Sequence, residues 1–344
     1  MKKRYVIGLL VLALIIIQFV VPPVLPVIQL PGEVLWQWPG GKEFAGGMFG
    51  AGFTNTFLAT ILTFLIIVGI ALSLKPKSRT ADEVPTGFYN FFEMIIEFAY
   101  GYVENAAGKW AKTFFPFFMT FILWIVVANW MELVPLVDAF GIQEDLGHHA
   151  VEVAEEEAAA EGRHLSEEEI HEIEADASEK GGVFAGNFWL VKPTEGEEAG
   201  KTIVPFVRAA ATDLNFTLAL AIISVVMTQY YGMKAQGMSY WKKFFVWDAE
   251  KIKQSPLAVM DSGVGLLEFI SEIFKIVSFA FRLLGNIFAG QVLLFVMAAL
   301  LPIANLLFWH LEFFVGILQA GVFALLTLTF MTAATESHHA EEAH

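Results

Sequence analysis

The chain has 344 residues, of which 56% are hydrophobic and 17% are charged, and its formal net charge is −15. Soluble domains average about 45–50% apolar and about 25% charged residues, so the composition excludes an ordinary water-soluble globule. Residues 144–179 contain 14 acidic residues and one basic residue, which leaves 22 acids and 20 bases elsewhere. The rest of the chain is therefore nearly neutral and offers no basic face to nucleic acid. The absence of cysteine excludes disulfides, thiolate metal sites and cysteine nucleophiles.

Apolar stretches predict five to six membrane helices, because a span needs about 20 mainly apolar residues. The first covers residues 5–21 and follows three basic residues, as expected of a signal peptide or a first membrane helix. No A-x-A site follows it and prolines end it, which favours a retained helix. Further spans are expected over residues 53–74, 114–130 and 209–231, and in one long tract, 276–332, that is broken near Pro302.

Residues 87–113 separate the second and third spans and have a different pattern. Phenylalanines and isoleucines alternate there with Glu93, Glu97 and Glu104. This pattern predicts an amphipathic helix that lies on the cytoplasmic membrane surface or against a partner.

Positive residues near the ends of spans indicate the cytoplasmic side. They form four groups, at residues 2–4, 75–79, 109–112 and 234–253. Threading from an inside N-terminus puts all four groups in the cytoplasm, with Arg208 as a minor exception at an outer end. The predicted organisation is a signal peptide or first helix (1–21), an external segment (22–52), two membrane helices with the surface helix between them (53–135), an external acidic insert (136–207), a membrane helix and a long hairpin (208–335), and a cytoplasmic tail (336–344).

The last two helices are too long to stand upright in a bilayer. Residues 264–301 would form a helix of about 57 Å and residues 303–335 one of about 50 Å, against a hydrocarbon core of about 30 Å. The first therefore bends at Gly285 or Gly290 or lies steeply tilted. A tilted hairpin of this kind presents a broad flank to a neighbouring protein.

Polar residues of the predicted hairpin are ordered in stripes. At about 100° per residue, five of them fall within about 80° of one another on the first helix. These five are Glu268, Glu272, Lys275, Arg282 and Asn286. Small residues, Ser278, Gly285 and Ala289, flank the arginine and allow another helix to approach. On the second helix Asn305, Glu312 and Gln319 are spaced by sevens, and Gln291 points to the opposite side of the first helix from Arg282.

Arg282 is the residue on which a functional interpretation depends. A guanidinium stays charged at physiological pH, and near mid-bilayer it costs about 3 to 10 kcal/mol. Two explanations are open: a buried arginine paired with a fixed carboxylate for packing, or a fixed cation beside an ion path.

Other polar groups of the hairpin have the same two kinds of interpretation. Glu312 is either a satisfied buried acid or a proton relay. Glu268, Glu272 and Lys275 are either an ordinary ion-pair cluster or part of a path whose stripe leads to the arginine. His310 is expected at an interface.

Residues 144–179 also contain four histidines. Ser166 and Glu169 have the spacing of a capping box that opens a helix over residues 167–177. The simplest interpretation of the stretch is a solvated external loop, and the alternative is a divalent-metal or cation-gathering site, although the histidines lack tight ligand spacing. No metal or cofactor is expected from the sequence. The tail after residue 335 is polar.

Four motifs in order resemble the membrane stator subunit a of the F-type ATP synthase. Residues 281–290, FRLLGNIFAG, look like the family's arginine-helix signature. Residues 129–135, NWMELVP, resemble its N-x-M-[DE]-x-x-P motif, 212–218 the start of its fourth helix, and 318–323 its final helix. The resemblance extends from about residue 53 to 335, and residues 144–205 align poorly.

The resemblance implies a proton channel for ATP synthesis in a bacterial inner membrane. The subunit would contact a ring of c subunits, each with one carboxylate, and peripheral-stalk b subunits, and would act on the soluble ATPase head through the complex. Protons would enter from outside past Asn286, Gln291, Glu312 and Gln319 and leave to the cytoplasm near Glu268, Ser271 and Ser278. Arg282 would stand between the two half-channels.

One departure from the family pattern and two rival functions accompany this interpretation. Family members often have an ionisable residue where this chain has Gln291, which makes Glu312 the single inlet relay expected. The rivals are a proton-coupled secondary transporter, for which no inverted repeat is visible, and a passive scaffold. No nucleotide-binding G-x-x-x-x-G-K-[ST] motif is present, so ATP chemistry belongs to a partner and the chain is no enzyme on its own. Proton and sodium both remain open, since selectivity depends on the ring.

Overall fold

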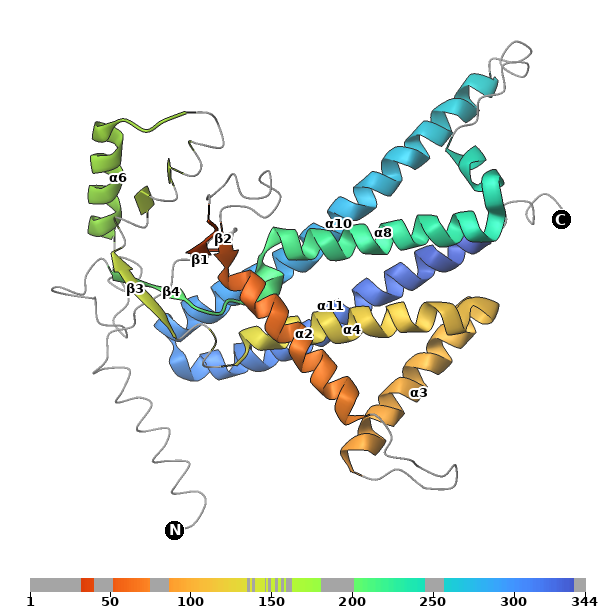
Figure 1. Ribbon diagram of the computed structural model, residues 1–344, viewed down its shortest axis with the longest axis horizontal. Helices are drawn as coiled ribbons and strands as arrows, with labels where there is room; N and C mark the ends of the chain where they lie inside the picture. Colours follow the sequence, from red (N-terminus) through yellow and green to blue (C-terminus); the bar gives the residue numbers. More distant parts are fainter. Residues whose placement is uncertain are drawn as a thin grey trace. The chain divides into compact units, whose positions relative to one another are not determined.

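The described part of the chain is mainly helical. The computed structural model describes residues 32–39, 52–74, 87–134, 163–180, 201–244 and 257–336, and at single positions or short runs 137, 140–145, 147, 150, 151, 154, 155 and 158 (Figure 1). Within these residues five helical stretches are long and apolar enough to cross a membrane. The all-α membrane fold predicted from the sequence is therefore confirmed. The predicted first helix, residues 1–21, and most of the tail lie outside the described residues.

Six helices carry the fold. They are α2 (Asn55–Ser73), α3 (Phe88–Ala107), α4 (Ala111–Glu132), α8 (Leu214–Gln236), α10 (Leu257–Leu300) and α11 (Pro302–Thr335). Short 3-10 segments, η2 (Gly108–Trp110), η4 (Ala210–Thr212) and η5 (Gly237–Lys243), adjoin α4 and the two ends of α8. In addition, α6 (Glu167–Lys180) lies in the acidic insert.

Local chemistry explains where α8 begins. The span predicted from residue 209 starts instead at Leu214, because Asp213 has extended backbone angles and its carboxylate accepts a hydrogen bond of 2.8 Å from the Asn215 N–H. This is the bond of an N-cap, which satisfies an amide that the helix itself leaves free.

The amphipathic segment is shorter than predicted. The helix expected over residues 87–113 ends at Ala107, because Gly108 has φ of +51° and turns the chain into η2 and α4. A positive φ is readily adopted by glycine and rarely by other residues. One side of α3 exposes large apolar side chains, among them Phe91, Phe98 and Tyr102. Ala99 and Val103 of the same helix are buried.

Helices α10 and α11 form the long hairpin that the sequence predicts. With 44 and 34 residues they extend about 66 Å and about 51 Å at 1.5 Å per residue. Helix α10 runs without interruption through both Gly285 and Gly290. Both helices exceed a hydrocarbon core of about 30 Å, so they cannot cross a bilayer upright.

Two small strand pairs were not predicted. Strands β1 (Val34–Gln37) and β2 (Gly52–Thr54) pair antiparallel just before α2. Strands β3 (Gly141–Asp145) and β4 (Lys201–Pro205) pair with Gly141 opposite Pro205 and Asp145 opposite Lys201. They are too short for a period-2 signal to stand out. The second pair brings the two ends of the acidic insert together.

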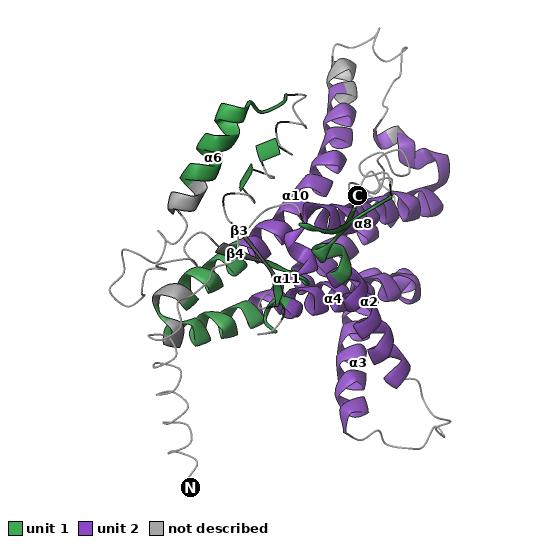
Figure 2. Ribbon diagram, turned by 60° about the vertical axis from the view of Figure 1, so that its left-hand side comes forward, with its two compact units in different colours: residues 1–58, 132–208, 289–313 green, residues 59–131, 209–288, 314–344 purple. Residues whose placement is uncertain are grey.

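The chain divides into two compact units (Figure 2). The second unit, residues 59–131, 209–288 and 314–344, has one apolar core built by α3, α4, α8, α10 and α11. Phe114, Ile125, Leu283 and Met331 are almost completely buried in it. These interlocking aromatic and aliphatic side chains fix the helices that carry most of the polar groups discussed below.

The first unit, residues 1–58, 132–208 and 289–313, contains a buried ion pair. Arg208 is only 2% exposed, and its Nη1 lies 3.7 Å from Oε1 of Glu33. The amide of Asn55 donates to the other oxygen of Glu33 and, at 3.1 Å, to the Pro205 carbonyl. Arg208 thus departs from the charge rule used for orientation because it is a paired, buried residue. The pair ties the chain before α2 to the chain before α8.

Helix α6 begins with the predicted capping box. The Glu169 N–H donates to the Ser166 hydroxyl at 3.3 Å, and the Glu169 carboxylate accepts from the Ser166 N–H and hydroxyl, both at 2.9 Å. These bonds hold the pKa of Glu169 below its usual value. The described residues contain no cluster of three metal-ligating side chains, and His148 and His149 lie outside them.

Replacing Ser166 by alanine tests this cap. Ser166→Ala should speed amide hydrogen exchange across residues 167–180 by about fivefold at neutral pH, because an N-cap is lost. Because the pKa of Glu169 is lowered in the folded chain, its ionised carboxylate stabilises the helix at pH values above the ordinary pKa of a glutamate. This stabilisation is lost as the pH falls through the lowered pKa of the folded chain. The difference between the two chains should therefore shrink in acid. Ser166→Thr should exchange like the wild type, and equal exchange in all three would contradict the cap.

Candidate functional site

Arg282 lies on an exposed face of α10. Its Nη2 donates to the Ser278 hydroxyl at 3.4 Å, and its guanidinium carbon is 5.7 Å from the centre of the Phe279 ring. Gly285 and Ala289, on the same face, are also exposed, and a Cβ added to Gly285 would meet nothing within 4 Å. The predicted arrangement of small residues around the arginine is present, with room for another helix.

No carboxylate in the described residues forms an ion pair with Arg282. The explanation of a buried arginine paired within the chain is therefore not supported where the structure can test it. The large exposed side chains around Arg282 on α10 are apolar, as at Phe274 and Phe281. A charge among apolar exposed groups on a membrane helix is costly unless protein or water covers it.

Glu312 of α11 is buried against α10. An added Cβ on Gly290 would lie only 2.5 Å from the Glu312 carboxyl carbon, so that the glycine leaves the space that the carboxyl group occupies. Gln291, the next residue on α10, is 3% exposed, and its Oε1 has no hydrogen-bond partner among the described residues. All three residues belong to the first unit. The buried Glu312 carboxyl group and the unsatisfied Gln291 amide oxygen are thus two polar groups within the mainly apolar pair of helices α10 and α11.

The rest of the predicted inlet set is distributed as follows. Glu312 is buried and Asn305 and Gln319 are half-buried, as expected of a stripe on one face of α11. Asn286 is half-buried on α10, and it belongs with Gln319 to the second unit. His310 is exposed, and its Nδ1 lies 2.7 Å from the Leu306 carbonyl.

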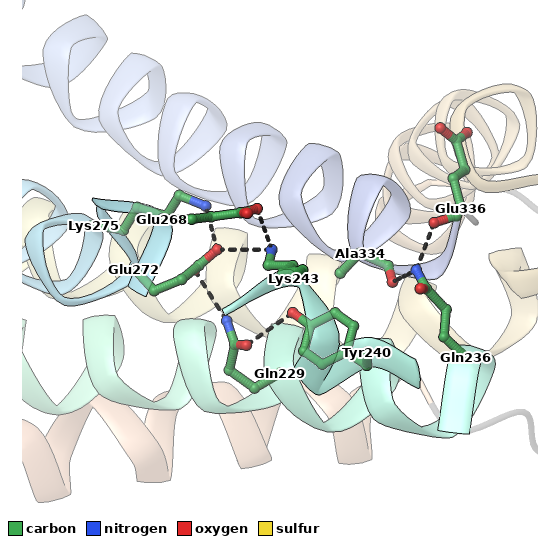
Figure 3. Close-up of polar contacts among 9 residues, drawn as sticks. All are labelled: Gln229, Gln236, Tyr240, Lys243, Glu268, Glu272, Lys275, Ala334 and Glu336. Atoms are coloured by element: carbon green, nitrogen blue, oxygen red, sulfur yellow. Dashed lines mark hydrogen bonds and ion pairs between the residues drawn. The ribbon is translucent and has the colours of Figure 1, made fainter. Parts of the chain in front are cut away.

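A second polar cluster joins η5, α8 and α10 in the second unit (Figure 3). Lys243 of η5 places its Nζ 3.1 Å from Glu268 and 3.4 Å from Glu272. Lys275, one turn along α10, lies 2.8 Å from the same Glu272 oxygen, Oε1. The other oxygen accepts from the Gln229 amide at 3.0 Å. The carboxyl groups of Glu268 and Glu272 therefore lie beside two ammonium groups. We call these five residues the exit cluster.

The exit cluster depends on a backbone segment that folds over α8 and α10. Tyr240 is buried against Gly232 of α8, where an added Cβ would lie 2.4 Å from its ring, and its hydroxyl donates to Gln229 at 2.8 Å. Phe244 packs on α10 in the same way, since a Cβ on Gly265 would lie 2.7 Å from its carbonyl oxygen. Two glycines thus permit the close approach that brings Lys243 to the carboxylates.

Lys243 is charged throughout the physiological pH range. Burial alone would lower the pKa of its ammonium. The Tyr240 hydroxyl and the carboxylates of Glu268 and Glu272 together raise the pKa by more than burial lowers it, so that it lies above the usual value for lysine. With a raised pKa, the stabilisation from these contacts is fully present at neutral pH and is lost only in strong alkali.

The predicted outlet residues do not all lie in the exit cluster. Glu268 belongs to it, whereas Ser271 and Ser278 are exposed on the side of α10 that carries Arg282. Arg282 itself is seven residues from Lys275, about 10 Å along the helix, and stays outside the cluster. The polar stripe that the sequence predicts on this helix therefore has two separate parts in the structure. Its beginning is ion-paired in the exit cluster, and Arg282 lies apart from that cluster.

Helix α8 is also joined to α11. The Ser224 and Thr327 hydroxyls are hydrogen-bonded at 2.7 Å between the two helices. At the end of α8 the Gln236 amide donates to the carbonyls of Ala334, at 3.0 Å, and Glu336. These bonds lie within the second unit and fix the helix that carries Gln229.

Residues of the N-x-M-[DE]-x-x-P motif have packing roles. Asn129 is 3% exposed, and its amide donates to the Gly316 carbonyl of α11 at 3.4 Å. The Thr63 hydroxyl of α2 lies 3.0 Å from the Met131 sulfur. The motif thus connects α4 to two other helices.

Sequence reasoning missed Lys243, Gln229 and Tyr240. Lys243 belongs to the basic group at residues 234–253, which was used only to orient the chain. Nothing in the spacing of residues 229, 240 and 243 relates them to α10. The separation of Glu33 from Arg208 in the sequence likewise concealed the buried ion pair.

Fold and polar positions together define a class, a polytopic α-helical membrane protein with ionisable side chains in its apolar helices. Comparison with known sequences narrows the class. A family profile described as "ATP synthase A chain" matches residues 57–332. The chain therefore belongs to the ATP synthase A chain family, a component of the membrane sector Fo, which confirms the resemblance drawn from the motifs.

Three relatives named ATP synthase subunit a illustrate the similarity. ATP synthase subunit a of Mycobacterium ulcerans (strain Agy99) is 27% identical over 294 residues, which cover 83% of this chain and 90% of the relative. The subunit a proteins of Marinomonas sp. (strain MWYL1) and Priestia megaterium (strain ATCC 12872 / QMB1551) are each 26% identical over 309 residues, which cover 86% of this chain and 88% and 97% of the relatives.

The contact between Gly290 and Glu312 yields a prediction. Gly290→Ala should leave the helices folded, because the added methyl group displaces only the end of a flexible side chain, but it should move the Glu312 carboxyl group. A shift of about 1 Å at a reacting group costs about 100-fold in rate, so ATP-driven proton pumping in vesicles should fall by tenfold or more. Gly69→Ala on α2, where a Cβ meets nothing within 4 Å, is the matched control. Normal pumping by assembled Gly290→Ala would contradict the geometry.

Proposed function

We propose that the chain forms the two proton half-channels of Fo and the fixed charge between them. One observation supports this most strongly, namely that Arg282 is exposed beside small residues and has no carboxylate partner in the described chain. The missing partner is then the carboxylate of a c-subunit ring, which lies against this face of α10. The chain contributes no ATP chemistry.

Arg282 acts on the ring carboxylate through charge. Two opposite unit charges about 4 Å apart attract by about 4 kcal/mol at an effective dielectric constant near 20. This is about a thousandfold change in an ionisation equilibrium. A ring site that arrives protonated therefore loses its proton near Arg282, and the same positive charge opposes the direct passage of a proton from one half-channel to the other.

The inlet leads from outside to the ring past Asn286, Gln291, Glu312 and Gln319. Glu312 is the titratable member of this set, and a carboxyl group can accept and return a proton. Gln291 cannot titrate, but its unsatisfied buried oxygen is an acceptor for water or for a protonated Glu312. The relay chemistry therefore depends on Glu312.

The outlet leads to the cytoplasm past Ser278 and Ser271 to Glu268. Both serines are exposed on the side of α10 that carries Arg282, and Glu268 is ion-paired and partly exposed. Hydroxyl groups can donate and accept hydrogen bonds and so support a water path to the carboxylate.

The basic groups at 75–79, 109–112 and 234–253 support a cytoplasmic location of the exit cluster, with the acidic insert outside. The relatives named above are bacterial, which supports a bacterial inner membrane. Peripheral-stalk b subunits would hold the chain against the turning ring, and the soluble ATPase head would use the rotation.

Arg282→Ala should abolish coupled ATP synthesis in reconstituted vesicles while the complex still assembles. The physical reason is that the neighbouring cation of the stripe, Lys275, lies about 10 Å along the helix and is paired with Glu272, so it does not replace Arg282 in favouring the ionised ring carboxylate. Synthesis driven by an imposed proton gradient is the measurement. Retained synthesis would refute the role of Arg282 and would favour a passive scaffold.

Glu312→Gln should reduce ATP-driven proton pumping at least about 100-fold, as expected when a general acid–base group is removed. His310→Gln, two residues away on the exposed side of α11, is the matched control and should pump normally. Pumping by Glu312→Gln at the wild-type rate would show that the inlet does not depend on this carboxyl group.

A further inference from the structure

The exit cluster contains a lysine that belongs to neither long helix. Lys243 stands in η5, and its ammonium lies between Glu268 and Glu272 at 3.1 and 3.4 Å (Figure 3). The rings of Tyr240 and Phe244 lie 5.2 and 4.8 Å from the same ammonium. The Lys243 side chain is 16% exposed, so it is held in one place by contacts on several sides.

The two carboxylates of the exit cluster differ in how many of their oxygens are already bonded and in their exposure to water. Glu272 is 10% exposed, with Lys243 and Lys275 on one oxygen and Gln229 on the other. Each of its oxygens is therefore already bonded. Glu268 is 37% exposed and combines contact with Lys243 with access to water. Only the second arrangement suits a group that exchanges protons with the cytoplasm.

We propose that Lys243 is a positioning residue for proton exchange at the cytoplasmic end of the outlet, held by Glu272 and acting through Glu268. This inference rests on the proposed function. During synthesis a proton that has left a ring carboxyl group and crossed the outlet binds the Glu268 carboxylate and then passes to water, which leaves Glu268 ionised again. Lys243 keeps that carboxylate at the exit and favours its charged form.

The surroundings of Glu268 determine the sign of the effect. From η5 it is faced by Lys243 and by the hydroxyl of Tyr240, and from α10 by Glu272 and Lys275. The neighbouring side of α8 contributes the neutral Gln229. From α11 comes the Phe330 ring, 4.4 Å from the Lys275 ammonium. Two carboxylates thus face two ammonium groups, and removal of Lys243 leaves an excess negative charge that makes a proton easier to bind.

The test uses the complete complex in inverted vesicles, with ATP-driven pumping measured against the pH of the cytoplasmic face. Proton uptake at this face requires a protonated Glu268. In Lys243→Met the alkaline limb of the plot of pumping rate against pH should therefore shift to higher pH by about one unit. Lys243→Arg keeps the charge and should restore the wild-type limb. Lys234→Met, which removes an exposed lysine on α8 that lies over Tyr231, should not move it.

The outcomes separate this inference from the function on which it rests. An unmoved limb in assembled Lys243→Met, or an equal loss at every pH, would mean that Lys243 only holds the fold together and would overturn the inference. Where the methionine variant fails to assemble, Lys243→Gln, which keeps a polar side chain, is measured in the same way. Arg282→Ala in the same vesicles tests the function separately, because proton pumping by this variant would refute the half-channels. If Arg282→Ala does not pump but the alkaline limb of Lys243→Met is unmoved, only the role of Lys243 is refuted.

Discussion

The constraint on which this molecule depends is a guanidinium on an exposed face of a membrane helix, for which the described residues provide no carboxylate partner. Arg282 cannot lose its charge, and the residues beside it are apolar or small. Lipid is a poor neighbour for such a group, so the face requires a protein partner that brings negative charge. Under the proposed function, a ring carboxylate meets this requirement each time it passes, and the arginine then favours its ionised form.

Several other charges of the described helices are paired with one another within their own unit. In the second unit Glu268, Glu272, Lys243 and Lys275 neutralise one another around η5 and α10. In the first unit Glu33 and Arg208 form a buried pair. Glu312 lies against Gly290 and has no ion-pair partner in the described chain, as the proposed proton relay requires. The paired charges hold described segments together, whereas Arg282 and Glu312 are the hairpin residues to which the proposal gives a transport role.

Hydropathy and local signals were sufficient to predict the membrane helices of the described residues, the capping box at Ser166 and the small residues around Arg282. Each depends on residues close in sequence. The strands escaped prediction because three to five residues carry too little pattern. The partners of Lys243 and Arg208 escaped because those contacts join distant segments, and only the folded chain brings them together. Gly232, Gly265 and Gly290 look alike in the sequence, yet the first and last make room for the side chains of Tyr240 and Glu312, and Gly265 makes room for the backbone of Phe244.

The central claim is that the Arg282 face of α10 lies against the ring. Since the chain has no cysteine, a single Ala289→Cys provides a unique probe, paired with a cysteine beside the ring carboxylate in the assembled complex. Oxidation should give a disulfide between the two chains, whereas Phe64→Cys, on the exposed side of α2, should give none. Failure of Ala289→Cys to cross-link to the ring in a complex that still pumps protons would contradict the account.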